Sequence, residues 1–283
     1  MERVSRSHCF DGWQDAYMHN SVACGGSIMH FSVYLPPAIV LSDHKVPVVW
    51  FLSGLTCNHE NAVLKSGIQR YASELGMCVV FPDTSPRGSD VPDDESYDLG
   101  QGASFYVDAV RSPWSKHFRM RTYIMDELQA LIIKNFPVDR ERQCIMGHSM
   151  GGHGALTIAL SDNKGIFRSV SAFAPICNPM SSNWGRKQLA EYLGGNQILW
   201  SKYDASEMIR QGGFNGRIKV DTGAEDPYFD QLNISSLEDA AATSEKGAQD
   251  LESVIHAGYD HSYFFVSTFV GSHLLWHKEN LQF

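Results

Sequence analysis

The pentad Gly-His-Ser-Met-Gly at residues 147–151 constrains the fold of this chain more than any other stretch. A short apolar run precedes it at 143–146, and a helix-like segment follows at 152–160. In a Gly-x-Ser-x-Gly pentad the serine occupies a sharp strand-to-helix turn, which exposes its hydroxyl above a sheet, and the glycines allow strand and helix to approach closely. Because the bare pattern also arises by chance, its meaning depends on this context and on partner residues further along the chain.

Short apolar runs of strand type alternate with helical segments along the chain. Several of the runs are continuously apolar, as strands buried on both faces are. This alternation predicts an α/β fold with a mostly parallel central sheet and helices on both faces, in a single domain spanning 1–283. Ligands of such sheets bind beyond the carboxyl ends of the strands. The expected strands are 31–35, 48–52, 78–81, 144–146, 170–173, 218–222 and 253–256, and the expected helices include 61–75, 123–136 and 263–277.

The charge balance and the cysteines limit the class of partner. With 32 acidic and 23 basic residues the net charge is −9, which disfavours nucleic acid and anionic membranes. The N-terminal residues lack the apolar core of a signal peptide, and the apolar run at 263–270 is too short to span a bilayer. Six cysteines show neither Cys-x-x-Cys nor zinc spacing. We therefore expect a cytoplasmic protein with free thiols, no metal and no membrane association.

A serine hydroxyl becomes a nucleophile only when a base removes its proton, and the base is held in one tautomer by a carboxylate. In α/β-hydrolase chemistry these groups follow the chain order Ser, Asp or Glu, His. Asp226 lies in the loop after the expected strand 218–222, and His261 lies in the loop after the last expected strand. We predict Ser149 as nucleophile, Asp226 as the orienting carboxylate and His261 as base.

Four neighbouring residues compete for these roles. Asp221 is expected inside its strand, and Glu225 is expected to point away from Asp226. A histidine at a strand end, such as His256, is more often packed than catalytic. Asp260 adjoins the predicted base, but neighbouring side chains in a loop usually diverge.

Hydrolysis also needs hydrogen-bond donors for the negative oxygen of the tetrahedral intermediate. The backbone N–H of Met150 is one candidate, because it begins the helix after the serine and the helix dipole favours negative charge there. The N–H of Leu55, in the loop after strand 48–52, is the second; the alternative is that this segment forms only a turn. Cys57 lies in the same loop. Most cysteines are small buried apolar residues, but this one is also a candidate site for inhibition by thiol reagents.

Six segments distributed along nearly the whole chain carry a more specific pattern: 31–37, 52–57, 81–88, 147–156, 171–179 and 258–263. Together these segments resemble the S-formylglutathione hydrolase family, also called esterase D, of the α/β-hydrolase superfamily. The resemblance implies hydrolysis of S-formylglutathione to glutathione and formate, the second step of glutathione-dependent formaldehyde detoxification. It also implies no metal, no organic cofactor and, commonly, a homodimer.

The same resemblance assigns site residues. It gives Ser149, Asp226 and His261 the roles above, with the N–H groups of Leu55 and Met150 as oxyanion donors.

The resemblance also matches Cys57 to a cysteine beside the family's active site, and Trp184 to a tryptophan near the acyl and glutathione site. Ordinary packing is the alternative for Trp184. Two departures concern the fit of the substrate rather than the reaction: Ser104 replaces a usual glycine, near what is expected to be the pocket, and Asn183 stands where proline is common.

The sequence thus predicts a serine hydrolase acting on a small-molecule thioester or ester. A formyl group offers almost no surface for binding, so a tight acyl pocket is expected to exclude long chains. A general short-chain carboxylesterase using the same residues is the first alternative. The others are an acyltransferase, as in the related mycolyltransferases, and a non-catalytic binding protein on a hydrolase scaffold.

Overall fold

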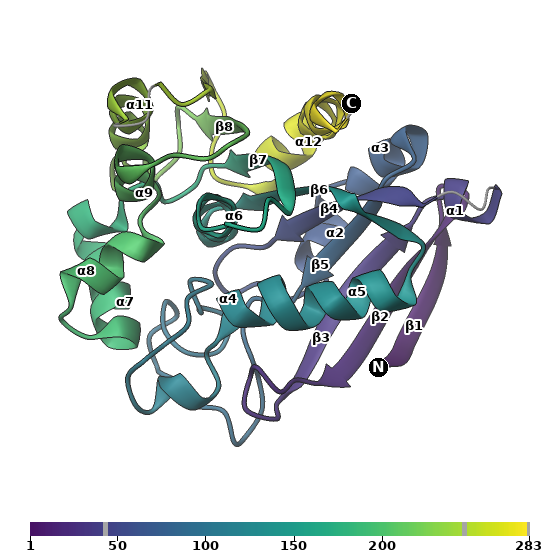
Figure 1. Cartoon of the computed structure of the whole chain (residues 1–283), viewed down its shortest axis with the longest axis horizontal. Coiled ribbons are helices and arrows are strands. Elements are labelled where there is room, and N and C mark those ends of the chain that lie inside the picture. Colours follow the sequence, from purple (N-terminus) through teal and green to yellow (C-terminus); the bar gives the residue numbers. More distant parts are fainter. Residues whose placement is uncertain (42–44, 245–247, 282–283) are drawn as a thin grey trace.

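A central sheet organises the computed structural model, which describes residues 1–41, 45–244 and 248–281. The described residues form nine strands in the order β1-β2-β3-β5-β4-β6-β7-β8-β9 (Figure 1). Strands from β5 to β9 are parallel, whereas β1, β2 and β3 are antiparallel, and β3 joins β5 in antiparallel register. The strands are β1 Glu2–Cys9, β2 Gly12–Asn20, β3 Ile28–Leu35, β4 Val46–Leu52, β5 Cys78–Pro82, β6 Val138–His148, β7 Phe167–Phe173, β8 Arg217–Gly223 and β9 Leu251–His256.

This sheet confirms the predicted fold class and every predicted strand, and it adds two strands that the sequence pattern missed. The missed strands are β1 and β2 at the N-terminal edge. Nearly all of β1 is exposed, and most of its residues are polar, so it carries no apolar run. Its place in the sheet depends on pairing with β2, a long-range contact rather than a local pattern.

Helices cover both faces of the sheet, as predicted. α5 and α6 lie on one face, and α3 and α12 lie on the other (Figure 1). None of the helices in the described ranges is both long enough and apolar enough to cross a membrane. The helices are α1 Ala38–Leu41, α2 Asn61–Lys65, α3 Ile68–Leu75, η1 Trp114–Lys116, α4 Met120–Thr122, the π-helix η2 Tyr123–Leu128, α5 Gln129–Asn135, α6 Met150–Leu160, η3 Pro179–Ser181, α7 Asn183–Leu193, α8 Gln197–Trp200, η4 Ser201–Tyr203, α9 Ala205–Gln211, α10 Phe229–Leu232, α11 Ile234–Thr243 and α12 Tyr263–Asn280.

Two predicted helices differ in detail from the observed ones. The segment predicted at 61–75 divides into α2 and α3, because Gly67 has a φ of 68° and interrupts the helical backbone. The segment predicted at 123–136 begins as the π-helix η2 and continues as α5. The last predicted helix, 263–277, corresponds to α12.

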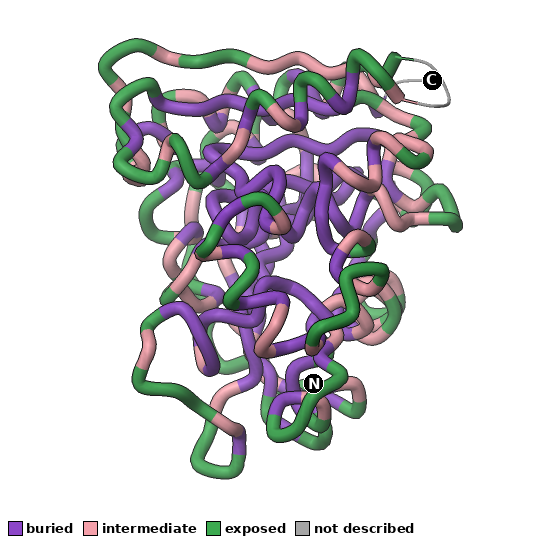
Figure 2. Tube along the Cα trace, turned by 90° about the vertical axis from the view of Figure 1, so that its left-hand side faces the viewer, coloured by how far each residue is buried: buried purple, intermediate pink, exposed green. Residues whose placement is uncertain are grey.

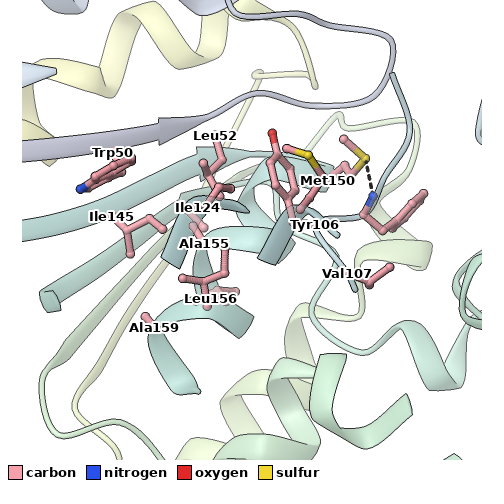
Figure 3. Close-up of a cluster of buried hydrophobic side chains, with 14 of the residues drawn as sticks. Trp50, Leu52, Tyr106, Val107, Ile124, Ile145, Met150, Ala155, Leu156 and Ala159 are labelled. Atoms are coloured by element: carbon pink, nitrogen blue, oxygen red, sulfur yellow. Dashed lines mark hydrogen bonds between the residues drawn. The ribbon is translucent and has the colours of Figure 1, made fainter. Parts of the chain in front are cut away.

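The core explains why β4 and β6 hold the predicted site firmly. Every residue of β4 is buried, and its side chains alternate between the two faces. Trp50 and Leu52 belong to the cluster that includes Leu156 of α6 (Figure 3). Phe51 packs on the other face with residues of α3 and α12. The trace in Figure 2 is buried through this central region and exposed along the peripheral loops. The carboxyl end of β4 is therefore anchored beside the beginning of α6.

Candidate active site

Ser149 occupies the turn that the pentad predicts. β6 ends at His148 and α6 begins at Met150, so a single residue joins strand to helix. Ser149 has φ 59° and ψ −121°, a backbone conformation that is strained for a residue other than glycine. Its N–H donates a hydrogen bond of 2.9 Å to the carbonyl of Phe173 on β7, which helps to hold this conformation.

The two outer glycines of the pentad are required by close packing. A Cβ atom on Gly147 would lie 2.1 Å from the carbonyl oxygen of Gly151. A Cβ atom on Gly151 would lie 2.0 Å from the carbonyl oxygen of Leu52, at the end of β4. Both distances are far shorter than a van der Waals contact, so α6 can start this close to β4 and β6 only with glycine at both positions.

Asp226 and His261 meet as predicted. Their loops leave the carboxyl ends of β8 and β9, and Oδ2 of Asp226 lies 2.5 Å from Nδ1 of His261. The second oxygen, Oδ1, accepts a 2.8 Å hydrogen bond from the N–H of Tyr228. The Asp226 side chain is fully buried. A buried carboxylate on Nδ1 favours the tautomer that leaves Nε2 able to accept a proton.

The competing residues form different contacts. Asp221 lies inside β8, and its Oδ2 is 2.9 Å from Nε2 of His256 and 3.4 Å from Nε2 of His273 on α12. His256 packs on Phe269 of the same helix, with ring centroids 4.0 Å apart. Asp221 and His256 therefore belong to a packed cluster against α12, as their positions in the strands indicated.

The remaining two competitors also point elsewhere. Asp260 accepts hydrogen bonds from the N–H and the hydroxyl of Ser262 at the start of α12. Glu225 is exposed. Asp226 is thus the carboxylate that contacts His261.

A pocket of about 290 Å³ brings the predicted site residues together. Ser149 and His261 share it with the loop after β4 and with several aromatic side chains. A larger hollow of about 590 Å³ lies at the C-terminal end of α6 and contains neither of these two residues, so size does not identify the site here. The pocket is lined by Gly54, Leu55, Thr56, Cys57, Tyr97, His148, Ser149, Trp184, Tyr228, His261 and Tyr263.

Both predicted oxyanion donors lie next to Ser149. The N–H of Met150 is the first of α6 and has no acceptor within the helix, and neither it nor the Leu55 N–H has a partner elsewhere in the described ranges. A Cβ atom on Gly54 would lie 3.2 Å from Cβ of Ser149, which places the loop after β4 directly beside the serine. These two N–H groups are available to a negative oxygen.

Hydrogen bonds from the segment around Phe105 support both donors. The hydroxyl of Tyr106 donates to the carbonyl of Ser53 at 2.8 Å, which fixes the loop just before Leu55. The N–H of Phe105 donates to Sδ of Met150 at 3.3 Å (Figure 3). No local sequence pattern predicts this support, because these residues lie far from the pentad in the chain.

His148 is the most informative site residue that the sequence analysis missed. Its ring is fully buried and lies 4.8 Å from the ring of His261. Burial, together with the nearby charge of His261, lowers the pKa of His148 to about 3. His148 is therefore neutral at pH 7 and adds no second positive charge beside the predicted base. Its position inside the pentad, next to Ser149, is the sequence feature that could have identified it as a site residue.

Aromatic residues that the sequence analysis missed form the wall of the pocket. Tyr228, two residues after Asp226, packs against His261 with ring centroids 5.0 Å apart and ring planes at 76°. Tyr263 follows the His261 loop and meets His148 at 5.4 Å. No pattern in the sequence predicts that Tyr97 lines the pocket.

Cys57 and Trp184 both line the pocket, as expected. Burial raises the pKa of the Cys57 thiol. The indole N–H of Trp184 donates to Asp98 at 2.8 Å, so this side chain is held in place as well as packed.

Neither Ser104 nor Asn183 lines the pocket. Ser104 is fully buried, and its hydroxyl donates to the carbonyl of Thr84 and accepts from the N–H of Tyr106, so it stabilises a turn. Asn183 is the first residue of α7. Neither side chain is therefore part of the pocket wall in the described structure.

All six cysteines are free, as their spacing predicts. Within the described ranges, no group of three or more histidine, cysteine, aspartate or glutamate side chains is arranged to hold a metal ion.

A largely parallel sheet, a strained serine between strand and helix, and an Asp–His pair after later strands together define the α/β-hydrolase class. Comparison with known proteins is more specific. A family model described as putative esterase matches residues 22–276. The S-formylglutathione hydrolase of Paracoccus denitrificans (strain Pd 1222) is 51% identical over 280 residues, covering 99% of this chain and 98% of that protein. The S-formylglutathione hydrolase of Mus musculus is 44% identical over 283 residues, covering 99% of both.

A solved structure agrees with these sequences. The S-formylglutathione hydrolase of Agrobacterium tumefaciens superposes with a TM-score of 0.94 at 44% identity, covering 100% of both chains. The chain belongs to the S-formylglutathione hydrolase family.

Proposed function

We propose that this chain is a serine hydrolase that cleaves S-formylglutathione to glutathione and formate, with side activity on short-chain carboxylic esters. The full-length relatives of that name support the choice of substrate. The observation that carries the proposal is the pocket of about 290 Å³ that contains Ser149 and His261 behind an aromatic wall. This volume lies just below the usual range of ligand pockets, so the site suits a small substrate.

In the proposed mechanism, Oγ of Ser149 attacks the thioester carbonyl while Nε2 of His261 takes the serine proton. Asp226 holds the imidazole and stabilises its charged form. The N–H groups of Leu55 and Met150 bind the negative oxygen of the tetrahedral intermediate.

Collapse of this intermediate breaks the carbon–sulfur bond. Glutathione leaves as the thiol with the proton from His261, and a formyl ester remains on Ser149. A water molecule then gives a proton to His261 and attacks the ester, and its breakdown returns the proton to Ser149 and releases formate.

The walls of the pocket explain the preference for a small acyl group. Trp184 and Tyr228 lie 6.1 Å apart as stacked rings, and Tyr228 contacts His261, so rigid side chains stand close to the reacting carbonyl. Activity is expected to fall from formyl and acetyl to longer acyl chains, and kcat/KM across a chain-length series measures this. Faster turnover of long-chain esters than of acetate would contradict it.

The decisive experiment compares kcat/KM for S-formylglutathione with that for p-nitrophenyl acetate, using Ser149→Ala to subtract uncatalysed hydrolysis. We expect formylglutathione to be preferred by more than about tenfold, or about 1.4 kcal/mol of barrier. Equal or better turnover of the aryl ester would instead favour a general short-chain carboxylesterase.

We further propose that the enzyme is a cytoplasmic homodimer. The family resemblance supports the dimer, and the six free cysteines support a reducing compartment. Light scattering on the eluting protein tests the assembly, and it is expected to give twice the chain mass of 31.6 kDa. A mass equal to that of one chain would contradict the dimer.

A further inference from the structure

A buried carboxylate stands directly behind the wall of the pocket. The side chain of Asp98 is 6% exposed, and its Oδ2 accepts 2.8 Å and 2.6 Å hydrogen bonds from Trp184 Nε1 and Gln188 Nε2. Its Oδ1 accepts a 2.7 Å hydrogen bond from Nζ of Lys187 and a further one from the hydroxyl of Ser96. Both oxygens are therefore occupied by donors.

The arrangement follows from the geometry of α7. Trp184, Lys187 and Gln188 are spaced i, i+3 and i+4, so their side chains leave one face of the helix. The helix start is fixed by Ser182, whose hydroxyl accepts a 2.9 Å hydrogen bond from the N–H of Gly185. Asp98 lies far earlier in the chain, in the loop between β5 and η1, and it accepts hydrogen bonds from all three of these side chains.

Trp184 connects Asp98 to the side chains of the pocket. Its indole meets the ring edge of Phe105 at 6.0 Å and stacks on Tyr228 at 6.1 Å. Tyr228 in turn contacts the ring of His261 at 5.0 Å. The indole therefore lies between a fixed carboxylate and the aromatic side chain that touches the predicted base.

We infer that Asp98 is a positioning residue that sets acyl-chain specificity by holding the Trp184 indole as the end wall of the acyl pocket. The inference rests on the proposed function in one respect, namely that acyl groups bind in the pocket of Ser149. A hydrogen bond to a charged acceptor is stronger than one to a neutral acceptor, so the carboxylate resists rotation of the indole.

The charge state of Asp98 suits this role. Burial alone would raise the pKa of Asp98, but hydrogen bonds from Lys187, Ser96 and Trp184 hold it below its usual range. The carboxylate is thus ionised throughout the neutral range, and the selectivity it maintains is expected to be independent of pH there.

Asp98→Asn is the sharpest perturbation because it preserves size. An asparagine has one oxygen and one NH₂ group, whereas the site presents donors to both positions. Whichever way the amide is turned, the indole N–H then faces either an NH₂ group or a neutral oxygen in place of a charged one, so its hydrogen bond is lost or weakened. Trp184→Phe removes the indole N–H and keeps an aromatic ring.

The matched control is Asp15→Asn. Asp15 on β2 is also fully buried, and it accepts two 2.7 Å hydrogen bonds from Arg6 and one of 2.8 Å from Tyr17. It lines no part of the Ser149 pocket. Asp15→Asn therefore removes a similar buried carboxylate and can lower stability, but it leaves the pocket unchanged.

The experiment measures kcat/KM for p-nitrophenyl acetate, butyrate and hexanoate, with thermal unfolding of each variant. The butyrate-to-acetate ratio is expected to rise about tenfold in Asp98→Asn and in Trp184→Phe, the discrimination that a small change in an apolar pocket typically produces. The double variant is expected to show no further rise in this ratio, because both substitutions break the same hydrogen bond between Trp184 and Asp98. Asp15→Asn is expected to keep the wild-type ratio.

An unchanged ratio in a folded Asp98→Asn variant would overturn the inference, even if its melting temperature falls. If that variant does not fold, an unchanged ratio in Trp184→Phe overturns it equally, because the indole N–H is the link to Asp98. These simple esters keep the test separate from the proposed substrate: poor turnover of S-formylglutathione would refute the proposed function and leave the ester ratios interpretable.

Discussion

Gly54→Ala tests the oxyanion site more sharply than removal of the nucleophile does. Gly54 directly precedes Leu55, whose N–H is a proposed donor. The added methyl would lie 3.2 Å from Cβ of Ser149 and 3.3 Å from the carbonyl oxygen of His148, tighter than most real contacts of a Cβ atom. The loop must therefore retreat by a few tenths of an ångström, and the Leu55 N–H moves with it.

The size of the effect follows from the contact that is weakened. Complete loss of one oxyanion donor costs about 2.7–4 kcal/mol, or roughly 10²–10³ in kcat. A donor that is displaced but still present should lose part of this, so we expect kcat to fall by about 10- to 100-fold, equivalent to about 1.4–2.7 kcal/mol. KM is expected to change little, because the negative oxygen exists only in the transition state and the intermediate.

The assay determines kcat and KM with p-nitrophenyl acetate and S-formylglutathione, and thermal unfolding verifies the fold. Gly195→Ala is the matched control, since a Cβ atom there meets nothing within 4 Å. We expect that variant to keep wild-type kinetics. A folded Gly54→Ala enzyme with wild-type kcat would refute the placement of Leu55 at the oxyanion.

Three further predictions concern the elbow, a buried histidine and the pocket thiol. Gly151→Ala should abolish esterase activity or soluble expression, because its Cβ atom would lie 2.0 Å from the carbonyl oxygen of Leu52; near-normal activity would contradict the close packing. Burial lowers the pKa of His153 to about 4, so the unfolded chain binds a proton that the folded chain does not, and stability is lost as pH falls from about 6.5 toward 4. In urea unfolding, the stability of the wild type relative to His153→Gln should therefore fall by about 1.4 kcal/mol from pH 8 to 5.5, and a constant difference would contradict this. Alkylation of Cys57 should slow the enzyme and accelerate with rising pH, since burial raises its pKa; unchanged sensitivity of Cys57→Ser would exclude that thiol.

The sequence determined the features that depend on chain order and local pattern. The pentad specifies a strand–turn–helix around Ser149, because only glycine tolerates the contacts at 147 and 151. The loops of Asp226 and His261 were predictable, since strands of a parallel sheet end at one edge and the order of the three residues is that of α/β hydrolases. Continuous apolar runs likewise identified β4 and the other buried strands.

Which side chains complete the site depends on how distant elements pack against each other. Asp98 and Trp184 are 86 positions apart in the chain, and no local sequence pattern predicts their hydrogen bond. Ser104 turns to a backbone carbonyl rather than to the pocket, and β1 becomes a strand through pairing with β2 although its residues are polar. Local periodicity records which face of an element is buried, whereas these contacts depend on how distant elements pack together. The position of Ser149 could thus be predicted from the sequence, but the wall that limits its acyl group could not.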